Sequence, residues 1–212
     1  MINLQILEII SAFIVISAFY IQGQAYFKPS IYAQAIQSLL IAILALYIGL
    51  SVNAIDYIFL AIAIIILRAF LLTIFLLRGL RKKPGIRERT RGVASELVIN
   101  LSFFTIAVFI VYYFILEKIN ITPEINSTTL LVLSFILFFQ GLFLIASRKG
   151  TIAQIIGFIE EENSIIIFGI LTAPIPFLIE ASIFLDVLGL IVISSILTLQ
   201  KTEHSQLEEL KG

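Results

Sequence analysis

Long apolar runs constrain the fold of this chain more than any other feature. A helix needs about 20 consecutive, mostly apolar residues to cross a bilayer, and the sequence holds about seven such runs. Apolar residues make up 60% of its 212 residues and charged residues 13%, whereas soluble domains have about 45–50% and about 25%. One small core cannot bury this excess, so most of it must face lipid. We therefore expect an all-α, polytopic membrane protein, a bundle of about seven transmembrane helices in the cell membrane.

The expected spans follow one another with short polar connections. In chain order they cover about Asn3–Tyr26, Ile31–Leu50, Ile55–Leu80, Val93–Leu116, Thr129–Ser147, Gly150–Leu171 and Ile175–Gln200. They divide the chain into a three-helix segment with a basic loop (1–92), a linking helix with an outer loop (93–127), a three-helix module (128–200) and a polar cytoplasmic tail (201–212).

Charges between the spans predict their orientation, because short cytoplasmic loops are rich in Lys and Arg. The loop after the third run carries a cluster of basic residues: Arg78, Arg81, Lys82, Lys83, Arg87, Arg89 and Arg91. Placing this loop in the cytoplasm also assigns the other charged ends, with Lys28, Arg148, Lys149 and Lys201 inside and Asp56, Glu117 and Glu124 outside. Seven spans then leave the N-terminus outside and the C-terminus in the cytoplasm. Binding to anionic lipid or to a partner subunit is the alternative role of the basic loop.

Composition excludes several classes of site. The sequence has no cysteine, and its one histidine, His204, lies in the polar tail. A thiolate metal site, a disulfide framework and a haem held by histidine within the membrane are therefore excluded, and no cofactor is expected. The formal net charge is zero, which gives no attraction to nucleic acid. The first residues include no basic segment and no small-residue cleavage site, so we expect no cleavable signal peptide.

Acidic residues within the last two runs are the best indication of function. Glu160, Glu161 and Glu162 lie in the sixth run, and Glu180 and Asp186 in the seventh. A carboxylate at the bilayer centre costs at least about 2.5–3.5 kcal/mol. Glu162 lies about 18 Å along its helix at 1.5 Å per residue, near the middle of a hydrocarbon core of about 30 Å. We expect such acids to be paired, hydrated or protonated, and a carboxyl that changes between charged and neutral forms can relay a proton.

Arg68, near the middle of the third run, is the expected internal partner for these acids. Three consecutive glutamates cover about 200° of a helix, so they cannot all face it. Asp186 points about 120° away from Glu180, and we expect it to meet a different surface, such as another subunit. Gln34 and Gln37 share one helix face and are expected to form hydrogen bonds between helices. Ion handling and purely structural pairing both stay open for the acids.

Two C-terminal segments resemble a known membrane subunit. GLFLIASRKGTIAQIIGFIEEENSIIIFGI holds a basic pair followed by Glu162 and Asn163. It resembles the second span of the K (4L) subunit of respiratory complex I, and also the C subunit of Mrp-type Na+/H+ antiporters. IEASIFLDVLGLI, which contains Glu180, resembles the third span of that K subunit.

The whole chain is similar to the hydrogenase-4 component E family, which has extra N-terminal spans before this module. The similarity covers Glu162–Ser164, Pro176, Ile179–Ala181 and Asp186, and more loosely Arg68 and Gln37–Leu39. The chain departs from its relatives at Ile159, where the complex I subunit has its first membrane glutamate, and at Ser164, where the family has glycine. Glu160 and Glu161 are additions to the pattern.

The resemblance implies a membrane-arm subunit of a group 4 NiFe hydrogenase or a related complex I-like oxidoreductase. It implies that this chain holds no redox centre, and that its partners are lipid, antiporter-like membrane subunits and a peripheral oxidoreductase arm. The implied ion-translocation residues are Glu162, Glu180, Arg68, Glu161 and Asp186, and the implied motif or interface residues are Arg148, Lys149, Asn163 and Gln37. The ion would be H+ or Na+. Two other roles stay open: an assembly scaffold of the same complex, and a stand-alone secondary transporter.

Overall fold

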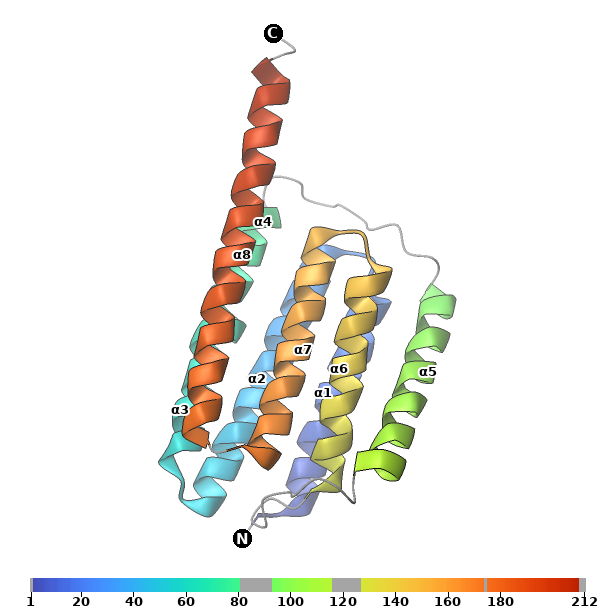
Figure 1. Cartoon of the computed structure of the whole chain (residues 1–212), viewed down its shortest axis with the longest axis vertical. Helices are drawn as coiled ribbons and strands as arrows, with labels where there is room; N and C mark the ends of the chain where they lie inside the picture. Colours follow the sequence, from blue (N-terminus) through green and yellow to red (C-terminus); the bar gives the residue numbers. More distant parts are fainter. Residues whose placement is uncertain (1, 81–92, 116–126, 174, 210–212) are drawn as a thin grey trace.

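The computed structural model describes residues 2–80, 93–115, 127–173 and 175–209, and every element among them is a helix. The elements are α1 (Leu4–Gly23), α2 (Phe27–Val52), α3 (Ile55–Ile64), the π-helix η1 (Ile65–Leu72), α4 (Thr73–Leu80), α5 (Val93–Ile110), the π-helix η2 (Val111–Ile115), α6 (Thr128–Ser147), α7 (Thr151–Thr172) and α8 (Ile175–Glu209). The expected all-α class is therefore confirmed for this part of the chain. Neighbouring helices run up and down along one common direction (Figure 1).

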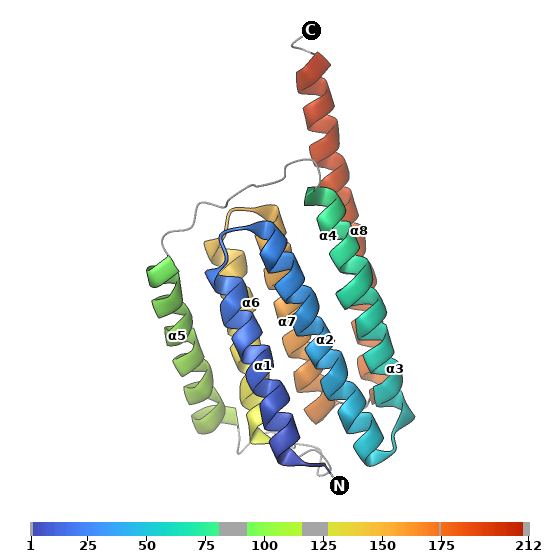
Figure 2. The same cartoon turned by 180° about the vertical axis from the view of Figure 1, so that it is seen from behind.

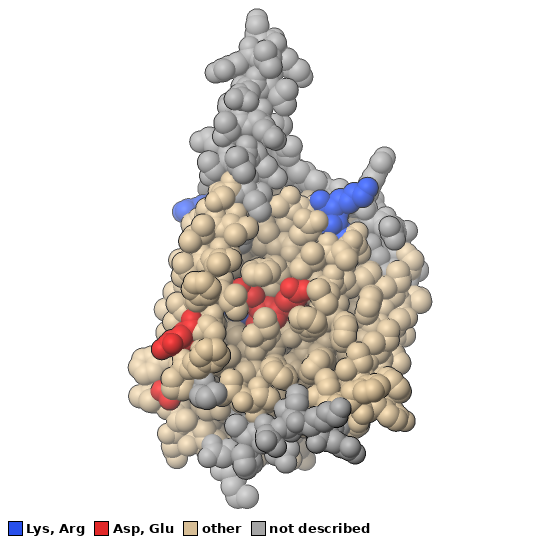
Figure 3. Space-filling view, viewed as in Figure 1, with Lys and Arg blue, Asp and Glu red and all other residues tan. Residues whose placement is uncertain are grey.

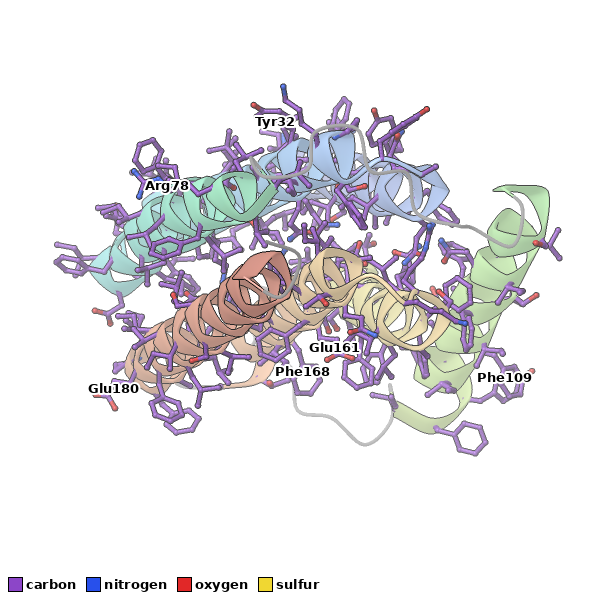
Figure 4. The ribbon with its side chains drawn as sticks, turned by 90° about the horizontal axis from the view of Figure 1, so that it is seen from above. Tyr32, Arg78, Phe109, Glu161, Phe168 and Glu180 are labelled. Carbon is purple, nitrogen blue, oxygen red and sulfur yellow. The ribbon has the colours of Figure 1, made fainter. Side chains whose placement is uncertain are left out.

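The helices form two layers. One layer contains α1, α2 and the continuous rod α3–η1–α4, and the other contains α6, α7 and α8 (Figures 1 and 2). α5 stands at one edge, where it packs against α1 and α6 (Figure 2). The view along the helices shows side chains of both layers filling the space between them (Figure 4).

Five helical stretches are long and apolar enough to cross a membrane. They are Leu4–Gly23, Phe27–Val52, Ile55–Leu80, Val98–Ile115 and Thr128–Ser147. Four agree with expected spans to within about four residues at each end, and the fourth span, expected from Val93, meets this criterion only from Val98. α7 and α8 coincide with the sixth and seventh expected spans, and α8 continues nine residues past Gln200 to Glu209. The basic loop at 81–92 and the outer loop at 116–126 lie outside the described residues.

Caps and turns define several helix ends. The Asn3 side chain accepts a hydrogen bond from the backbone N–H of Gln5 at the start of α1, and Ser127 caps α6 in the same way through Leu130. Between α2 and α3 the chain reverses at Asn53, whose φ is 54°. Asparagine is one of the few residues that adopt this left-handed conformation at low cost.

α6 and α7 approach each other closely, backbone to backbone, at two glycines. A Cβ atom added to Gly141 would lie 2.6 Å from the Gly157 carbonyl oxygen, and one added to Gly157 would lie 2.8 Å from the Gly141 carbonyl oxygen. Glycine at both positions lets the two backbones touch, as small residues do in packed membrane helices. This contact holds the middle of α7, with its three glutamates, against α6.

Candidate functional site

A buried guanidinium, that of Arg68, is the centre of the candidate site. Arg68 lies in η1 and is 2% exposed. Its Nε donates to Asp186 Oδ1 of α8 at 2.6 Å, and its Nη1 donates to Asn163 Oδ1 of α7 at 2.9 Å. Its Nη2 lies 3.5 Å from Glu162 Oε2, close enough for an ion pair but without hydrogen-bond geometry. One planar fork of donors thus joins three side chains from two helices of the opposite layer.

Two further hydrogen bonds extend the network into α2. Asn163 Nδ2 donates to Gln37 Oε1 at 3.0 Å, and Gln37 Nε2 approaches Glu160 Oε1 at 3.5 Å. The complete set, called here the ionic network, is Gln37, Arg68, Glu160, Glu162, Asn163 and Asp186. All six side chains are buried, with at most 2% of their surface exposed.

Helix geometry explains how α7 contributes three members to this network. Glu160 and Asn163 are three residues apart and therefore share one face of the helix, which is the face toward α2. Glu162 lies about 200° around the helix from Glu160, so it faces Arg68 and α8 instead. The acid between them, Glu161, points away from the space between the layers (Figure 4).

The ionic network lies about halfway along the α3–α4 rod and along α7. Arg68 is thirteen residues from Ile55 and twelve from Leu80, the two ends of a candidate membrane span. Glu162 is eleven residues from Thr151 and ten from Thr172. At 1.5 Å per residue each is about 15–20 Å from either helix end. Charged groups at that depth need partners, since an isolated buried charge is very costly.

Acidic groups outnumber basic groups in the ionic network. Three carboxyl groups and one guanidinium belong to it, and the nearest partner of Glu160 is an amide. Three acceptor atoms have no hydrogen-bond partner among the described residues: Glu160 Oε2, Glu162 Oε1 and Asp186 Oδ2. Buried acceptors of this kind are ordinarily satisfied by water or by a bound proton shared with a neighbour.

The structure brings several of the expected residues together. Arg68 pairs with the acidic segment through Glu162, which confirms the expected internal partner. Asn163 and Gln37 join the same network, so Gln37 does form the expected bond between helices. Asp186 meets a different surface from Glu180, as expected, but that surface is inside this chain and not another subunit: Asp186 makes the shortest contact with Arg68. The reason is that α8 packs against α3 and η1, which turns the Asp186 face of α8 inward.

Glu180 and Glu161 lie apart from the ionic network. Glu180 is exposed on the outer side of α8 and points away from the bundle (Figure 4). Glu180 is therefore not among the buried carboxyl groups of the site, and its implied part in ion translocation stays a prediction. Glu180 and Asp186 differ by about 120° around α8, so turning Asp186 toward Arg68 turns Glu180 outward. Glu161 is half-buried, and acidic atoms show in a recess at mid-height of the α6–α8 face (Figure 3).

The basic pair after α6 lies at one end of the bundle. Arg148 is 4% exposed, and its Nη2 donates to the Gln22 carbonyl oxygen of α1 at 2.7 Å. Lys149 is exposed. Their expected part in an interface with another subunit stays a prediction. The polar tail with His204 forms the last turns of α8, and its side chains are not among those described.

Sequence reasoning missed two parts of the site. The sequence assigns no role to Glu160. Its spacing to Asn163 equals that of Gln34 to Gln37 on α2, which puts each pair on one helix face, and polar side chains on such faces form hydrogen bonds between helices. The π-helical segment around Arg68 had no signal in the sequence. π-Helical turns occur frequently at functional sites, and here the Arg68 carbonyl oxygen accepts a hydrogen bond from Thr73 Oγ1 at 3.4 Å.

Metal binding and similarity to known proteins give no further information. Among the described residues, no three His, Cys, Asp or Glu side chains are grouped so as to hold a metal ion. No protein-family model, no curated protein and no solved structure matches the chain. The candidate site therefore has to be interpreted from its own chemistry.

Proposed function

We propose that this chain is a non-redox membrane-arm subunit of a complex I-like, group 4 hydrogenase-type oxidoreductase, and that its ionic network forms part of a proton (or sodium) translocation path. One observation carries the proposal: three carboxyl groups and a single guanidinium are linked by amide side chains at half-depth of the bundle. Intramembrane groups of this kind usually mark ion paths. The resemblance of Glu162–Asn163 and Asp186 to the hydrogenase-4 component E pattern supplies the class of complex.

In the proposed arrangement α7 and α8 also cross the membrane, which gives seven spans with the N-terminus outside. Two facts support this. α7 packs along α6, which is itself a candidate span, and Glu161 of α7 lies directly beside Gly141 of α6. α8 runs beside α3 and η1, also within a candidate span. α7 carries three glutamates within its apolar sequence, and α8 carries Glu180 and Asp186; functional acids are expected within membrane spans of this kind.

The proposed mechanism uses the excess of carboxyl groups. Arg68 pairs with Asp186 at 2.6 Å and with Glu162 only at 3.5 Å, so the two carboxyl groups compete for one cation. A proton that binds Glu162 lowers the net negative charge of the ionic network and frees Arg68 for Asp186 alone. Loss of that proton to a neighbouring subunit restores the first state. The amide groups of Asn163 and Gln37 connect this exchange with Glu160.

The decisive experiment compares Glu162→Gln and Asp186→Asn in the assembled complex. Inverted membrane vesicles would report protons moved per electron pair, and a native gel would report assembly. We expect both variants to assemble and to lose most of their pumping, at least 5-fold, while electron transfer continues. Glu8→Gln, at an exposed acid on α1, is the control that should pump normally. Normal pumping by both Glu162→Gln and Asp186→Asn would contradict the proposal.

An assembly scaffold is the second candidate, and the short Arg68–Asp186 bond favours it. A buried ion pair of this kind can be purely structural, and removing one partner then costs about 3–5 kcal/mol. The scaffold role predicts that Glu162→Gln and Asp186→Asn remove the chain from the complex on the native gel. Glu180→Gln also helps to distinguish the ion-path role from the scaffold role, because the exposed Glu180 side chain can affect pumping or assembly only where a neighbouring subunit faces it.

A further inference from the structure

Three buried glutamines near the Arg148 end of the bundle have amide groups that the protein does not satisfy. Gln22 of α1 and Gln34 of α2 are 3% exposed, and Gln140 of α6 is 0% exposed. Both amide atoms of Gln34 and of Gln140, and the Oε1 atom of Gln22, have no hydrogen-bond partner among the described residues. Leaving so many buried amide atoms without partners is costly. Ordered water is the usual partner of such groups inside proteins.

These glutamines lie between the end of the bundle and the depth of Glu160 in the ionic network. Gln22 is one residue from the end of α1, Gln140 is seven from the end of α6, and Gln34 is seven from the start of α2. Glu160 is nine residues from the start of α7. At 1.5 Å per residue the depths are about 1.5, 10.5, 10.5 and 13.5 Å. Ser38, one turn beyond Gln34 at about 16.5 Å, also has a buried hydroxyl with no partner among the described residues.

Hydrogen bonds join the outer members of this series. Arg148 donates to the Gln22 carbonyl oxygen at 2.7 Å, and Gln22 Nε2 donates to the Gln140 carbonyl oxygen at 2.8 Å. Beside Arg148 is a cavity of about 10 Å³, lined in part by Gln24, Tyr26 and Ser30. That volume is about the smallest that holds one water molecule. At the inner end, Glu160 Oε2 is a buried acceptor without a partner among the described residues.

We propose that Gln22, Gln34, Gln140 and Ser38 line a file of ordered water that runs from the end of the bundle at Arg148 to the depth of Glu160 and Ser38. The inference deepens the proposed function, on which its transport role rests, because it names the route by which protons reach the ionic network. Gln22 lies on α1, Gln34 and Ser38 on α2 and Gln140 on α6, so the route uses the N-terminal helices as well as the three-helix module. The hydroxyl and amide groups offer both donors and acceptors, as a chain of hydrogen-bonded water requires.

Cysteine reactivity tests the water file directly, because the chain has no native cysteine. Ser38→Cys places a thiol in the file, and Ser134→Cys is its matched control: Ser134 is equally buried, at 1%, but its hydroxyl already donates to the Leu131 carbonyl oxygen. Each full-length variant in lipid nanodiscs is treated with methyl methanethiosulfonate, which reacts with the thiolate and therefore needs local water. We expect Ser38→Cys to react at least 10-fold faster than Ser134→Cys. Equal rates would overturn the proposal.

A second pair of cysteine variants keeps the test valid if one of the first pair does not fold. Gln140→Cys should react at least 10-fold faster than Leu137→Cys, a buried apolar position on the same helix at 0% exposed, with helix content by circular dichroism matched to the unaltered chain. In the assembled complex, Gln34→Leu together with Gln140→Leu should lower pumping at least 3-fold. Fast cysteine reactions with unchanged pumping would overturn the proton route and leave the proposed function standing. Only normal pumping in Glu162→Gln and Asp186→Asn would remove the function itself.

Discussion

At the scale of single residues, the contact between the two layers depends on how the Arg68 guanidinium is shared among its partners. Arg68 is the only basic side chain in the ionic network, and the described carboxyl groups around it come from α7 and α8. Its three nitrogen atoms each face a different partner. A lysine has no planar fork and could not reproduce this arrangement. The stability of the interlayer contact should therefore respond strongly to this residue.

Arg68→Met is predicted to destabilise the bundle by about 3–5 kcal/mol, because it leaves Glu162 and Asp186 buried without a counter-ion. Unfolding in mixed micelles, followed by circular dichroism, would measure the change. The double variant Arg68→Met with Asp186→Leu removes one of the stranded acids, so it should recover part of that loss. A double variant less stable than Arg68→Met would contradict the assignment of a shared cation.

Adjacent glutamates of α7 give a matched pair for a second prediction. Glu162→Gln removes the buried ion pair of Glu162 with Arg68, at 3.5 Å, and should cost about 1–3 kcal/mol. Glu161→Gln alters a half-buried side chain that points away from the ionic network (Figure 4), so its effect should stay within about 0.5 kcal/mol. Both follow from the same unfolding measurement. Equal losses in the two variants would show that burial along α7, and not contact with Arg68, decides the effect.

At the scale of elements, the close contact between α6 and α7 positions half of the ionic network. Gly141 and Gly157 meet backbone to backbone, and a Cβ on Gly141 would also lie 2.8 Å from the Glu161 Cγ atom. Because α7 is held here, about one turn from Glu160, any separation of the two helices would shift its polar face relative to Gln37. A small residue at this crossing is therefore part of the site, although it carries no charge.

Gly141→Ala should force the helices apart and cost about 1–3 kcal/mol through overpacking. Gly23→Ala is the control, since a Cβ there meets nothing within 4 Å. Unfolding experiments on both variants would give the difference. In the assembled complex Gly141→Ala should also lower pumping, whereas Gly23→Ala should not. If Gly141→Ala does not change the free energy of unfolding, the close backbone contact between α6 and α7 is contradicted.

Much of the helical framework could be predicted, and the reasons lie in particular elements. The ends of α6 and of the α3–α4 rod followed from apolar runs bounded by polar residues. The pairing of Arg68 with Glu162 followed from the cost of a lone membrane charge. The rotation of α8 could not be predicted, since Asp186 and Glu180 are both acidic and only packing against η1 decides which faces inward. The π-helical segment also depends on tertiary packing, and no residue pattern predicts it.

At the scale of the whole molecule, the two ends of the bundle differ in charge. The hydrogen bond from Arg148 to Gln22 shows that the end of α6 and the end of α1 lie together, which puts Lys28 and Lys149 at one end. Asp56 begins α3 after α2 has crossed the bundle, so it lies at the opposite end, near the N-terminus (Figure 1). The C-terminal end of α8 extends beyond the basic end. In a membrane, the positive-inside rule would place the basic end in the cytoplasm and the opposite end outside.

The last prediction concerns that orientation. Lys149→Cys and Asp56→Cys, each the sole thiol of the chain, should react with a membrane-impermeant maleimide from opposite sides. We expect Lys149→Cys to react only in inside-out vesicles and Asp56→Cys only in intact cells, because basic ends are retained in the cytoplasm. Labelling of both positions from one side would contradict the two-ended arrangement of the bundle. Labelling from opposite sides with the assignments exchanged would keep the fold but place the water file of Gln22 and Gln140 at the outer surface, so that protons would approach Glu160 from outside.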